Sequence, residues 1–244
     1  MPAEPTKKRK RGHLAAVLAV TAVIVLVSGF FFGRALWWSL RPTPEFGSLA
    51  AQPDAALRGT VAFIRPFPDN GCVWVVAASE AKPKKVACVD GGAGDLKWLP
   101  DGRIQSTRYQ GGEGTSDTRS WIFDVATGAV EEVPLDQIPP QQDTPSVVVG
   151  PQGERVTATS EKGRLRMTMT DRTGTRTLLS VDAPDTYSFG QPTWSSDGEW
   201  FIVKDDLDRL LLVTTTEPSR TRVLVAGGHT PAVTADEHPA EPGR

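Results

Sequence analysis

The sequence predicts an all-β fold, a small β-propeller of about four blades, preceded by a single transmembrane α-helix. Three observations lead to this prediction. One long uncharged segment lies near the N-terminus, the rest consists of short Val-, Ile-, Leu-, Phe-, Trp- and Thr-rich runs broken by Gly, Pro and Asp, and those runs repeat. Short runs bounded by turn residues are typical of strands, and repeats of about 45 residues are typical of propeller blades.

The uncharged segment predicts a membrane anchor. Leu14 to Phe32 is a run of 19 residues without a charge. As a helix it spans roughly 28 Å, which is enough for the hydrocarbon core of a bilayer. The basic cluster Lys7–Arg11 precedes it and Trp37–Trp38 follow it, which indicates a cytoplasmic N-terminus. We therefore expect a cytoplasmic basic tail over 1–13, a transmembrane helix in contact with lipid over 14–33, and an extracytoplasmic remainder at the cell membrane.

A cleaved signal peptide is the alternative to an anchor. Ser48-Leu49-Ala50 resembles a cleavage site, but it lies well beyond the apolar run, which is itself longer than a usual signal sequence. Residues 34–58 include three prolines and show no periodicity, so they are expected to form an extracytoplasmic linker. Residues 237–244, polar with two prolines, are expected to be a disordered tail.

The charge of the chain is divided unequally. Seven of the 27 basic residues and one of the 29 acidic residues lie within residues 1–41, so the remainder carries a net charge of −8. A nucleic-acid-binding surface needs basic residues to neutralise phosphates. The acidic remainder therefore argues against nucleic acid as a partner.

A short motif repeats along the extracytoplasmic part. The segment Pro192–Gly198 reads PTWSSDG, Trp98–Gly102 reads WLPDG, and a weaker copy ends at Gly153. The three glycines Gly102, Gly153 and Gly198 are 51 and 45 residues apart. Asp101-Gly102 and Asp197-Gly198 favour tight turns, because Gly accepts a positive φ and Asp bonds nearby backbone amides. The tryptophans four residues earlier, Trp98 and Trp194, are then expected on inner strands, packed between neighbouring sheets.

This motif resembles the TolB-like, WD40-like propeller repeats of bacteria, whose pattern is Pro-x-Trp-Ser-x-Asp-Gly. Pro192–Gly198 matches the pattern completely and Trp98–Gly102 partly, whereas Val149 and Gln152 depart from its Trp and Asp positions. The resemblance covers roughly residues 59–236, which we expect to form the propeller-like domain. Families with this repeat often have six or more blades, so room for about four leaves ring closure open. A β-sandwich with fortuitous Asp-Gly turns is the alternative fold.

The first blade lacks an innermost strand, and the C-terminal region contains a candidate for it. Its other strands are expected at Thr60–Ile64, Cys72–Ala77 and Lys85–Val89. Pro231–Glu237 aligns with Pro192–Gly198, with Val233 in place of the Trp and Asp236 in place of the Asp. We predict that Pro231–Thr234 pairs beside Thr60–Ile64, because an open ring exposes strand edges and an apolar face. A chance match followed by a disordered tail is the alternative.

The two cysteines are expected to be cross-strand neighbours. Cys72 and Cys88 are equally far from a turn centred near Glu80. In a hairpin that symmetry brings their Cβ atoms about 4.5–5.5 Å apart. An oxidising exterior would permit a disulfide between them. Two buried free thiols are the alternative.

No catalytic residues, cofactor or metal site are predicted. The chain has no Gly-x-Ser-x-Gly nucleophile elbow and no phosphate-binding Gly-rich loop. Asp205, Asp206 and Asp208 offer oxygen ligands of the kind that Ca²⁺ accepts, but a solvated turn is the favoured interpretation. We therefore expect a non-enzymatic binding, scaffold or sensor module with a protein or peptide partner. The alternative function is an extracytoplasmic hydrolase or lyase with carboxylates at the propeller mouth.

Overall fold

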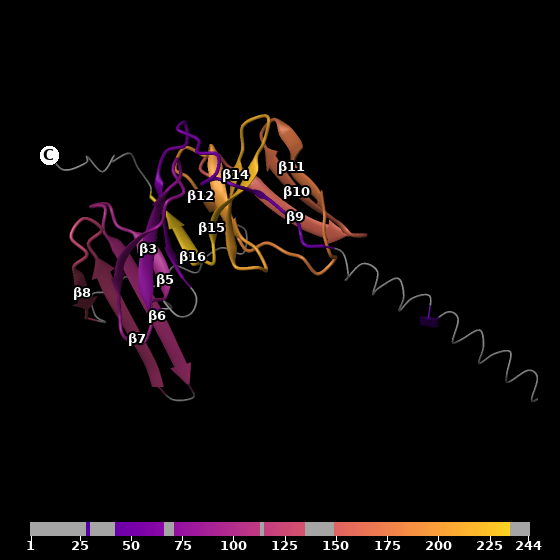
Figure 1. Cartoon of the computed structure of the whole chain (residues 1–244). Helices are drawn as coiled ribbons and strands as arrows, with labels where there is room; N and C mark the ends of the chain where they lie inside the picture. The colour runs from indigo at the N-terminus through magenta and orange to yellow at the C-terminus, as the bar shows by residue number, and fades with distance from the viewer. Residues whose placement is uncertain (1–27, 30–41, 66–70, 113–114, 135–148, 235–244) are drawn as a thin grey trace, which may run out of the picture.

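Four β-sheets, antiparallel except for one parallel strand pair, make up the described part of the chain (Figure 1). The computed structural model describes residues 28–29, 42–65, 71–112, 115–134 and 149–234. Within these ranges, no helix has the length and apolar character needed to cross a bilayer. Apart from Ser28 and Gly29, the predicted anchor over 14–33 lies outside the described residues, as do the tails over 1–13 and 237–244 and the repeat residue Asp236. These assignments remain predictions.

Blades 1 and 2 each contain four strands. Blade 1 has the order β16-β2-β3-β4, with strands His229–Val233, Thr60–Ile64, Cys72–Ala77 and Lys84–Cys88. Blade 2 has the order β5-β6-β7-β8, with strands Asp95–Trp98, Ile104–Gly112, Thr115–Phe123 and Val130–Val133. The predicted strands of blade 1 are therefore confirmed within a residue.

Among the described residues, blade 3 has three strands and blade 4 has five. Blade 3 has three strands in the order β11-β10-β9, which span Gly174–Asp182, Arg164–Asp171 and Arg155–Glu161. Blade 4 has five strands in the order β1-β15-β14-β13-β12, which span Gly47–Ser48, Thr221–Ala226, Arg209–Thr214, Trp200–Lys204 and Thr193–Trp194. At the inner side of β9, Val149 forms an isolated bridge to Arg155, and residues 135–148 before it lie outside the described residues.

The C-terminal strand completes blade 1, as predicted. Strand β16 pairs antiparallel with β2, with Ala232 opposite Ala62 and Val233 opposite Val61. The chain segment before it approaches the core closely, since a Cβ at Gly228 would lie 2.8 Å from Leu210 Cδ1. The last described strand thus joins the first blade to the last one.

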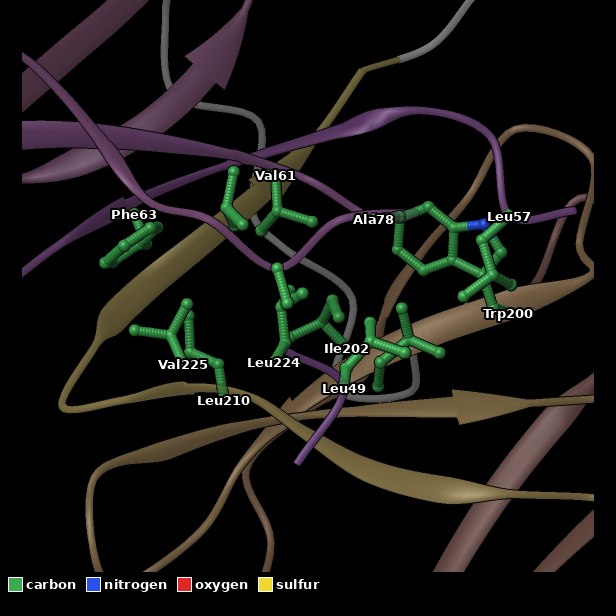
Figure 2. Packing of buried hydrophobic residues seen from close by; sticks show 13 residues of the cluster. Leu49, Leu57, Val61, Phe63, Ala78, Trp200, Ile202, Leu210, Leu224 and Val225 are labelled. Atoms are coloured by element: carbon green, nitrogen blue, oxygen red, sulfur yellow. The ribbon is translucent and has the colours of Figure 1, made fainter. Parts of the chain in front are cut away.

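Three hydrophobic clusters arrange the blades in the spatial order 2-1-4-3. The first joins blades 1 and 4 (Figure 2) and includes Phe63, Trp200 and Leu212. The second joins blades 1 and 2, and the third joins blades 3 and 4 through Met167 and Phe201 among others. None of the clusters among the described residues joins blade 2 to blade 3, and these two blades lie at opposite ends of the molecule in Figure 1. The four blades therefore form an open arc. Blades 1 and 4, the first and last in sequence, are in contact at its centre, whereas blades 2 and 3, which follow each other in sequence, lie at its two ends.

The described part of the predicted linker, residues 42–58, differs from the expected unstructured tether. Gly47–Ser48 forms β1 and pairs in parallel with β15. Leu49 is fully buried and Leu57 is nearly so, both within the cluster between blades 1 and 4. Because these two leucines stand alone among prolines and polar residues, the sequence shows no periodicity that would predict their burial. We call residues 44–58 the strap.

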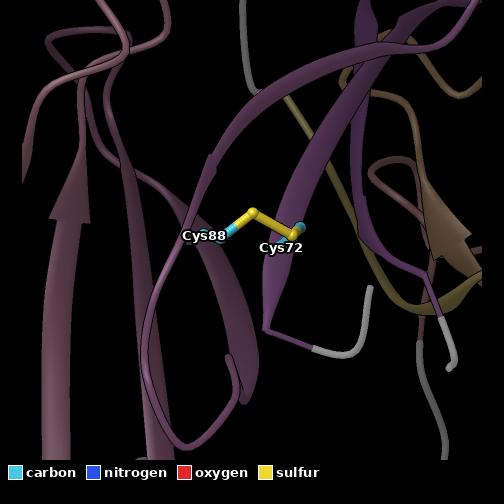
Figure 3. The surroundings of a disulfide bond; sticks show 2 residues. All are labelled: Cys72 and Cys88. Atoms are coloured by element: carbon cyan, nitrogen blue, oxygen red, sulfur yellow. A yellow bond between two sulfur atoms is a disulfide. The ribbon is translucent and has the colours of Figure 1, made fainter. Parts of the chain in front are cut away.

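The predicted disulfide is present. Cys72 and Cys88 lie opposite each other in strands β3 and β4 and are bonded (Figure 3). The equal distances from the turn near Glu80 therefore predicted the cross-strand register correctly. The bond connects the outermost strand of blade 1 to the rest of that sheet.

Candidate binding site at the inner strands

The inner strands of three blades meet at β16. The indole Nε1 of Trp98 in β5 donates to the carbonyl of Ala232 at 3.1 Å. The hydroxyl of Thr193 in β12 donates to the carbonyl of Pro231 at 3.3 Å. Two side chains of neighbouring blades thus bond to carbonyl groups of the inserted strand. Strand β16 is therefore bonded to blades 2 and 4 as well as to β2, and it links the inner strands of three blades.

The two repeat tryptophans lie where the motif predicted them. Trp98 is on inner strand β5 and packs against the cluster between blades 1 and 2. Trp194 is on inner strand β12 and packs between blades 3 and 4, with its ring centroid 4.8 Å from that of Phe201. Gly150 lies against this indole, since a Cβ there would be 3.0 Å from Trp194 Cε2. Both tryptophans therefore serve in packing between blades.

The Asp-Gly positions form the expected turns. The φ angles are 80° at Gly102, 92° at Gly153 and 74° at Gly198, in the left-handed region that glycine favours. Asp101 accepts hydrogen bonds from the backbone and side chain of Arg103 at 3.1 and 2.7 Å. The bond from the Arg103 backbone, and then the one from its side chain, lower the pKa of Asp101. These residues are structural elements of the turns.

A cavity of about 240 Å³ opens beside the turn of blade 4 and the end of β16. Its lining comes from the end of the strap and Gly59, from the turn after β12, and from the end of β16, which we call the latch: Arg58, Gly59, Ser195, Ser196, Asp197, Trp200, Val233 and Thr234. Arg58 and Asp197 bring one charge of each sign to this cavity, and both are exposed. Val233 is its partly exposed apolar residue, and the buried Trp200 behind it donates from Nε1 to the carbonyl of Arg58 at 3.0 Å.

The serine in this cavity is held by the turn. Ser195 is buried, and its Oγ lies 2.7 Å from both Asp197 Oδ1 and the carbonyl oxygen of Trp200. Its single hydroxyl proton is shared between these two acceptors, while the Trp200 amide donates to the same Oγ at 3.2 Å. No histidine is among the described residues that line the cavity. An activated serine needs an adjacent base, so this arrangement supports binding rather than nucleophilic attack.

The three carboxylates of the acidic loop point to separate partners. Asp205 is buried and accepts bonds from Arg209 Nε and the Tyr187 hydroxyl, each at 2.7 Å. Burial and the bond to Asp205 raise the pKa of Tyr187. Asp206 accepts from the backbone and hydroxyl of Ser188 at 2.6 and 2.8 Å. Among the described side chains, no three His, Cys, Asp or Glu groups converge as metal ligands would.

The third carboxylate belongs to a contact between blade 4 and the latch. Asp208 Oδ1 lies 2.9 Å from Lys204 Nζ and 3.6 Å from His229 Nδ1. Lys204 Nζ is also 2.9 Å from His229 Nδ1. His229 is the first residue of β16, so this group ties the start of the latch to the turn of blade 4. The hydrogen bond from Lys204 lowers the pKa of Asp208.

The sequence motifs did not identify most of the cavity lining. Arg58, Trp200 and Thr234 belong to no copy of the repeat pattern. The hydroxyl of Thr234 accepts the Thr60 amide at 3.1 Å, and its own amide donates to the Thr60 carbonyl at 3.0 Å. The sequence alignment that placed residues 231–234 beside β2 is the one sequence feature that could have indicated this part of the cavity.

Comparison with known proteins adds solved structures of low similarity. No family model and no curated protein matches the chain. TolB from Acinetobacter baumannii is 15% identical over 70% of this chain and 42% of its own, with a TM-score of 0.25. The isopeptidase AtxE2 is 10% identical over 69% of this chain and 38% of its own, with a TM-score of 0.34. An oligogalacturonate lyase in complex with manganese is 11% identical over 66% and 51%, with a TM-score of 0.20.

The chain spans less than two thirds of the length of each of these three proteins. The class of the fold, propeller blades of antiparallel strands, rests on the four sheets of this chain itself. Nothing about the activities or ligands of these proteins transfers to it.

Proposed function

We propose that this protein is a membrane-anchored, extracytoplasmic β-propeller arc that acts as a non-enzymatic binding module for a protein or peptide. The observation that carries this proposal is the cavity beside β16, where Arg58 and Asp197 bring both charges beside the partly exposed, apolar Val233. Small numbers of polar groups placed on an apolar wall are typical of recognition sites. The alternative of a hydrolase or lyase has less support, because Asp197 is the one carboxylate among the described lining residues.

The location outside the cytoplasm is part of the same proposal. The uncharged run over 14–33 and the preceding basic cluster support an anchor with a cytoplasmic N-terminus. The bond between Cys72 and Cys88 supports an oxidising compartment, where disulfides persist. A reporter active only outside the cytoplasm should be active when fused after Arg244 and inactive when fused at Lys7. The reverse pattern would contradict the proposed topology.

Filling the cavity tests the binding function. Ser196 is exposed at the cavity, so Ser196→Trp should block it without disturbing the core. Full-length protein in detergent is used to purify partners, and each recovered protein is quantified against the Ser196→Trp variant. We expect the specific partner to fall at least about tenfold, the loss that about 1.4 kcal/mol of binding free energy produces.

The matched control is Glu131→Trp, which adds the same side chain to exposed strand β8 of blade 2. It should recover the partner as the wild type does. Equal recovery by the wild type and by Ser196→Trp would show that the cavity is not the binding site. Turnover of a peptide or glycan substrate that Asp197→Asn abolishes would favour the enzymatic alternative.

A further inference from the structure

A second cavity lies between blades 3 and 4, and it shares no lining residue with the cavity beside β16. Its volume is about 450 Å³, and ligand pockets typically have volumes of about 300–1,000 Å³. The lining comes from strand β11 and from the turn between β14 and β15: Arg176, Thr177, Leu178, Glu217, Pro218 and Ser219. All six residues lie within the continuously described range 149–234.

The turn on one side of this cavity is fixed to blade 4. The hydroxyl of Ser219 donates to the Thr214 carbonyl at 2.8 Å, and the Arg220 amide donates to the Thr214 hydroxyl at 2.8 Å. The hydroxyl of Thr215 donates to the Gly198 carbonyl, also at 2.8 Å. These bonds hold the turn in place without a ligand, and such preorganisation lowers the entropy cost of binding.

The guanidinium group of Arg176 has donors that no described residue uses. Its Nη2 donates to the Thr215 carbonyl at 2.7 Å and thereby links blade 3 to blade 4. Its Nε is buried and has no hydrogen-bond partner among the described residues. Its Nη1 lies 3.9 Å from Asp171 Oδ2, which is too far for a hydrogen bond. Because a buried donor without a partner is costly, a ligand that supplies an acceptor is expected here.

The neighbouring carboxylates restrict the charge of that ligand. Asp171 Oδ1 accepts from the amides of Thr173 and Gly174 at 2.7 and 3.2 Å, so this carboxylate is engaged by its own turn. Glu217 is exposed and makes no ion pair with the described residues. One arginine and two carboxylates give the region a net charge of −1, which disfavours a simple anion. A ligand that carries both an ammonium and a carboxylate group suits this arrangement.

We propose that the cavity between blades 3 and 4 binds a small apolar zwitterion, namely an amino acid or a dipeptide with free termini. The ligand carboxylate accepts from Arg176, and the ammonium group pairs with Glu217. Ser219 donates its proton to Thr214, so its oxygen is left to accept from the ammonium group. The apolar side chain of the ligand contacts Leu178 and Pro218, which line the same cavity.

Calorimetric titration of the full-length protein in detergent tests the proposal. The probes are leucine and leucyl-leucine, which distinguish an amino acid from a dipeptide. Two leucine analogues each lack one charge: 4-methylpentanoate has no ammonium group, and 3-methylbutylamine has no carboxylate. Each analogue should bind at least about tenfold more weakly than leucine, because one buried charged partner is then left unpaired. If the dipeptide is the ligand, its N-acetylated and C-amidated forms should show the same losses.

Two outcomes of this titration would overturn the proposal. One is that neither leucine nor leucyl-leucine binds in the millimolar range. The other is that removing one charge from the ligand leaves its affinity unchanged.

Substitution of Glu217 tests the ammonium contact. Glu217→Gln removes a charge from an exposed turn, so the fold should be retained. The preference for leucine over 4-methylpentanoate should disappear in this variant. The matched control is Glu132→Gln on exposed strand β8 of blade 2, which should keep the preference. Unchanged preference in Glu217→Gln would show that Glu217 does not bind the ligand, contrary to the proposal.

Filling the cavity tests its location without touching the contact between Arg176 and Thr215. Thr177 is exposed at the cavity, so Thr177→Trp should abolish binding. Thr175→Trp places the same side chain two residues earlier on β11, outside the lining, and should bind as the wild type does. Ser196→Trp should also leave binding unchanged, which separates this site from that of the proposed function. Equal binding by Thr177→Trp and the wild type would overturn the proposal.

Discussion

The junction between blades 1 and 4 contrasts with the outer faces of blades 2 and 3. At the junction, β16 pairs with β2, the strap buries Leu49 and Leu57, and Trp200 is fully buried. The strap also bonds to blade 4 through Leu49, whose amide donates to the Val223 carbonyl at 2.9 Å. Segments from the two ends of the described chain thus build the most elaborate interface of the molecule.

The faces of blades 2 and 3 that point away from their neighbours are polar. In blade 2 this face carries Ser120 and Gln105, which are buried, and Thr107; the hydroxyl of Ser120 lies 3.1 Å from Gln105 Nε2 and 3.3 Å from Thr107 Oγ1. In blade 3 the strand alternation places polar residues on this face: Thr157, Thr159, Arg166, Thr168, Thr170 and Thr177. Their opposite faces carry the apolar residues of the clusters.

The contrast indicates why the arc stays open in the middle of the chain. Terminal units of a repeat array need a polar outer face, whereas internal units bury apolar faces on both sides. Blades 2 and 3 are adjacent in sequence, but they have the polar faces of terminal units. Blades 1 and 4 are the first and last in sequence, but they are the internal units of the arc.

Removal of the latch should have the largest effect. A chain ending before Gly228 loses β16, which exposes the edge of β2 and removes the carbonyl acceptors of Trp98 and Thr193. We expect more than about 5 kcal/mol of destabilisation, with aggregation through the exposed edge. Thermal unfolding and light scattering of residues 42–227 measure it.

Ending the chain before Glu237 provides the control, since it leaves β16 intact. That truncation should melt like the longer protein. If the two truncated proteins have the same melting temperature, β16 does not stabilise the junction between blades 1 and 4, and the proposed contrast between that junction and the outer blades is wrong.

Large-to-small substitutions should distinguish the two regions. Trp200→Ala removes a fully buried indole at the junction, where such changes cost about 3–5 kcal/mol. For a domain of this size the melting temperature should fall by roughly 6–20 °C. Thr168→Ala on the polar face of blade 3 should change stability by less than about 0.5 kcal/mol. Similar shifts for the two variants would mean that blade 3 has a covered outer face.

Loss of the disulfide should have an intermediate effect. The Cys72–Cys88 bond closes a sequence separation of 16 residues, and a loop of that size contributes roughly 3 kcal/mol. Urea unfolding of the Cys72→Ser/Cys88→Ser variant, compared with the oxidised protein, measures this contribution. The latch should remain paired, because the bond lies in the outer hairpin of blade 1. Two titratable thiols in the denatured, unreduced protein would show that the bond does not form.

The sequence predicted the parts of the fold that a local pattern encodes. The Asp-Gly turns, the inner tryptophans and the Cys72–Cys88 register each follow from spacing within one or two strands. The alignment of residues 231–237 with the motif also predicted the latch, because β16 retains part of the repeat pattern found on the inner strands of other blades.

Features made by segments that are distant in sequence were not predictable in this way. Leu49 and Leu57 carry no periodic signal, and they are buried only because blades 1 and 4 meet beside the strap. The separation of blades 2 and 3 depends on which faces of β6 and β10 are polar. The alternation of residues along a strand shows which residues share a face, but it does not show which blade, if any, packs against that face. The cavity combines Arg58 with Thr234, residues that β2 and β16 bring together.

The smallest expected effect tests a single ion pair at the junction. Asp208→Asn removes the charge that Lys204 and His229 approach at 2.9 and 3.6 Å. The carboxylate is 45% exposed, so solvent screening limits the loss to less than about 1 kcal/mol. Its pKa in the folded state is lowered below 3.8, chiefly by the hydrogen bond from Lys204. The contribution is therefore fully present above that value and disappears as the pH falls through the lowered folded pKa.

The control for this pair is Asp101→Asn in blade 2, which removes an exposed bond to Arg103 at 2.7 Å but does not touch the latch. Global stability alone does not separate two such small effects, so the measurement is amide hydrogen exchange. Asp208→Asn should speed exchange in β16 at neutral pH, because it frees the first residue of that strand, whereas Asp101→Asn should not. At a pH below the lowered folded pKa of Asp208 the difference between Asp208→Asn and the wild type should vanish, since both side chains are then uncharged. Faster exchange of β16 in both variants would mean that the latch responds to the stability of the whole arc, and the Lys204–Asp208–His229 contact would then have no local role in closure.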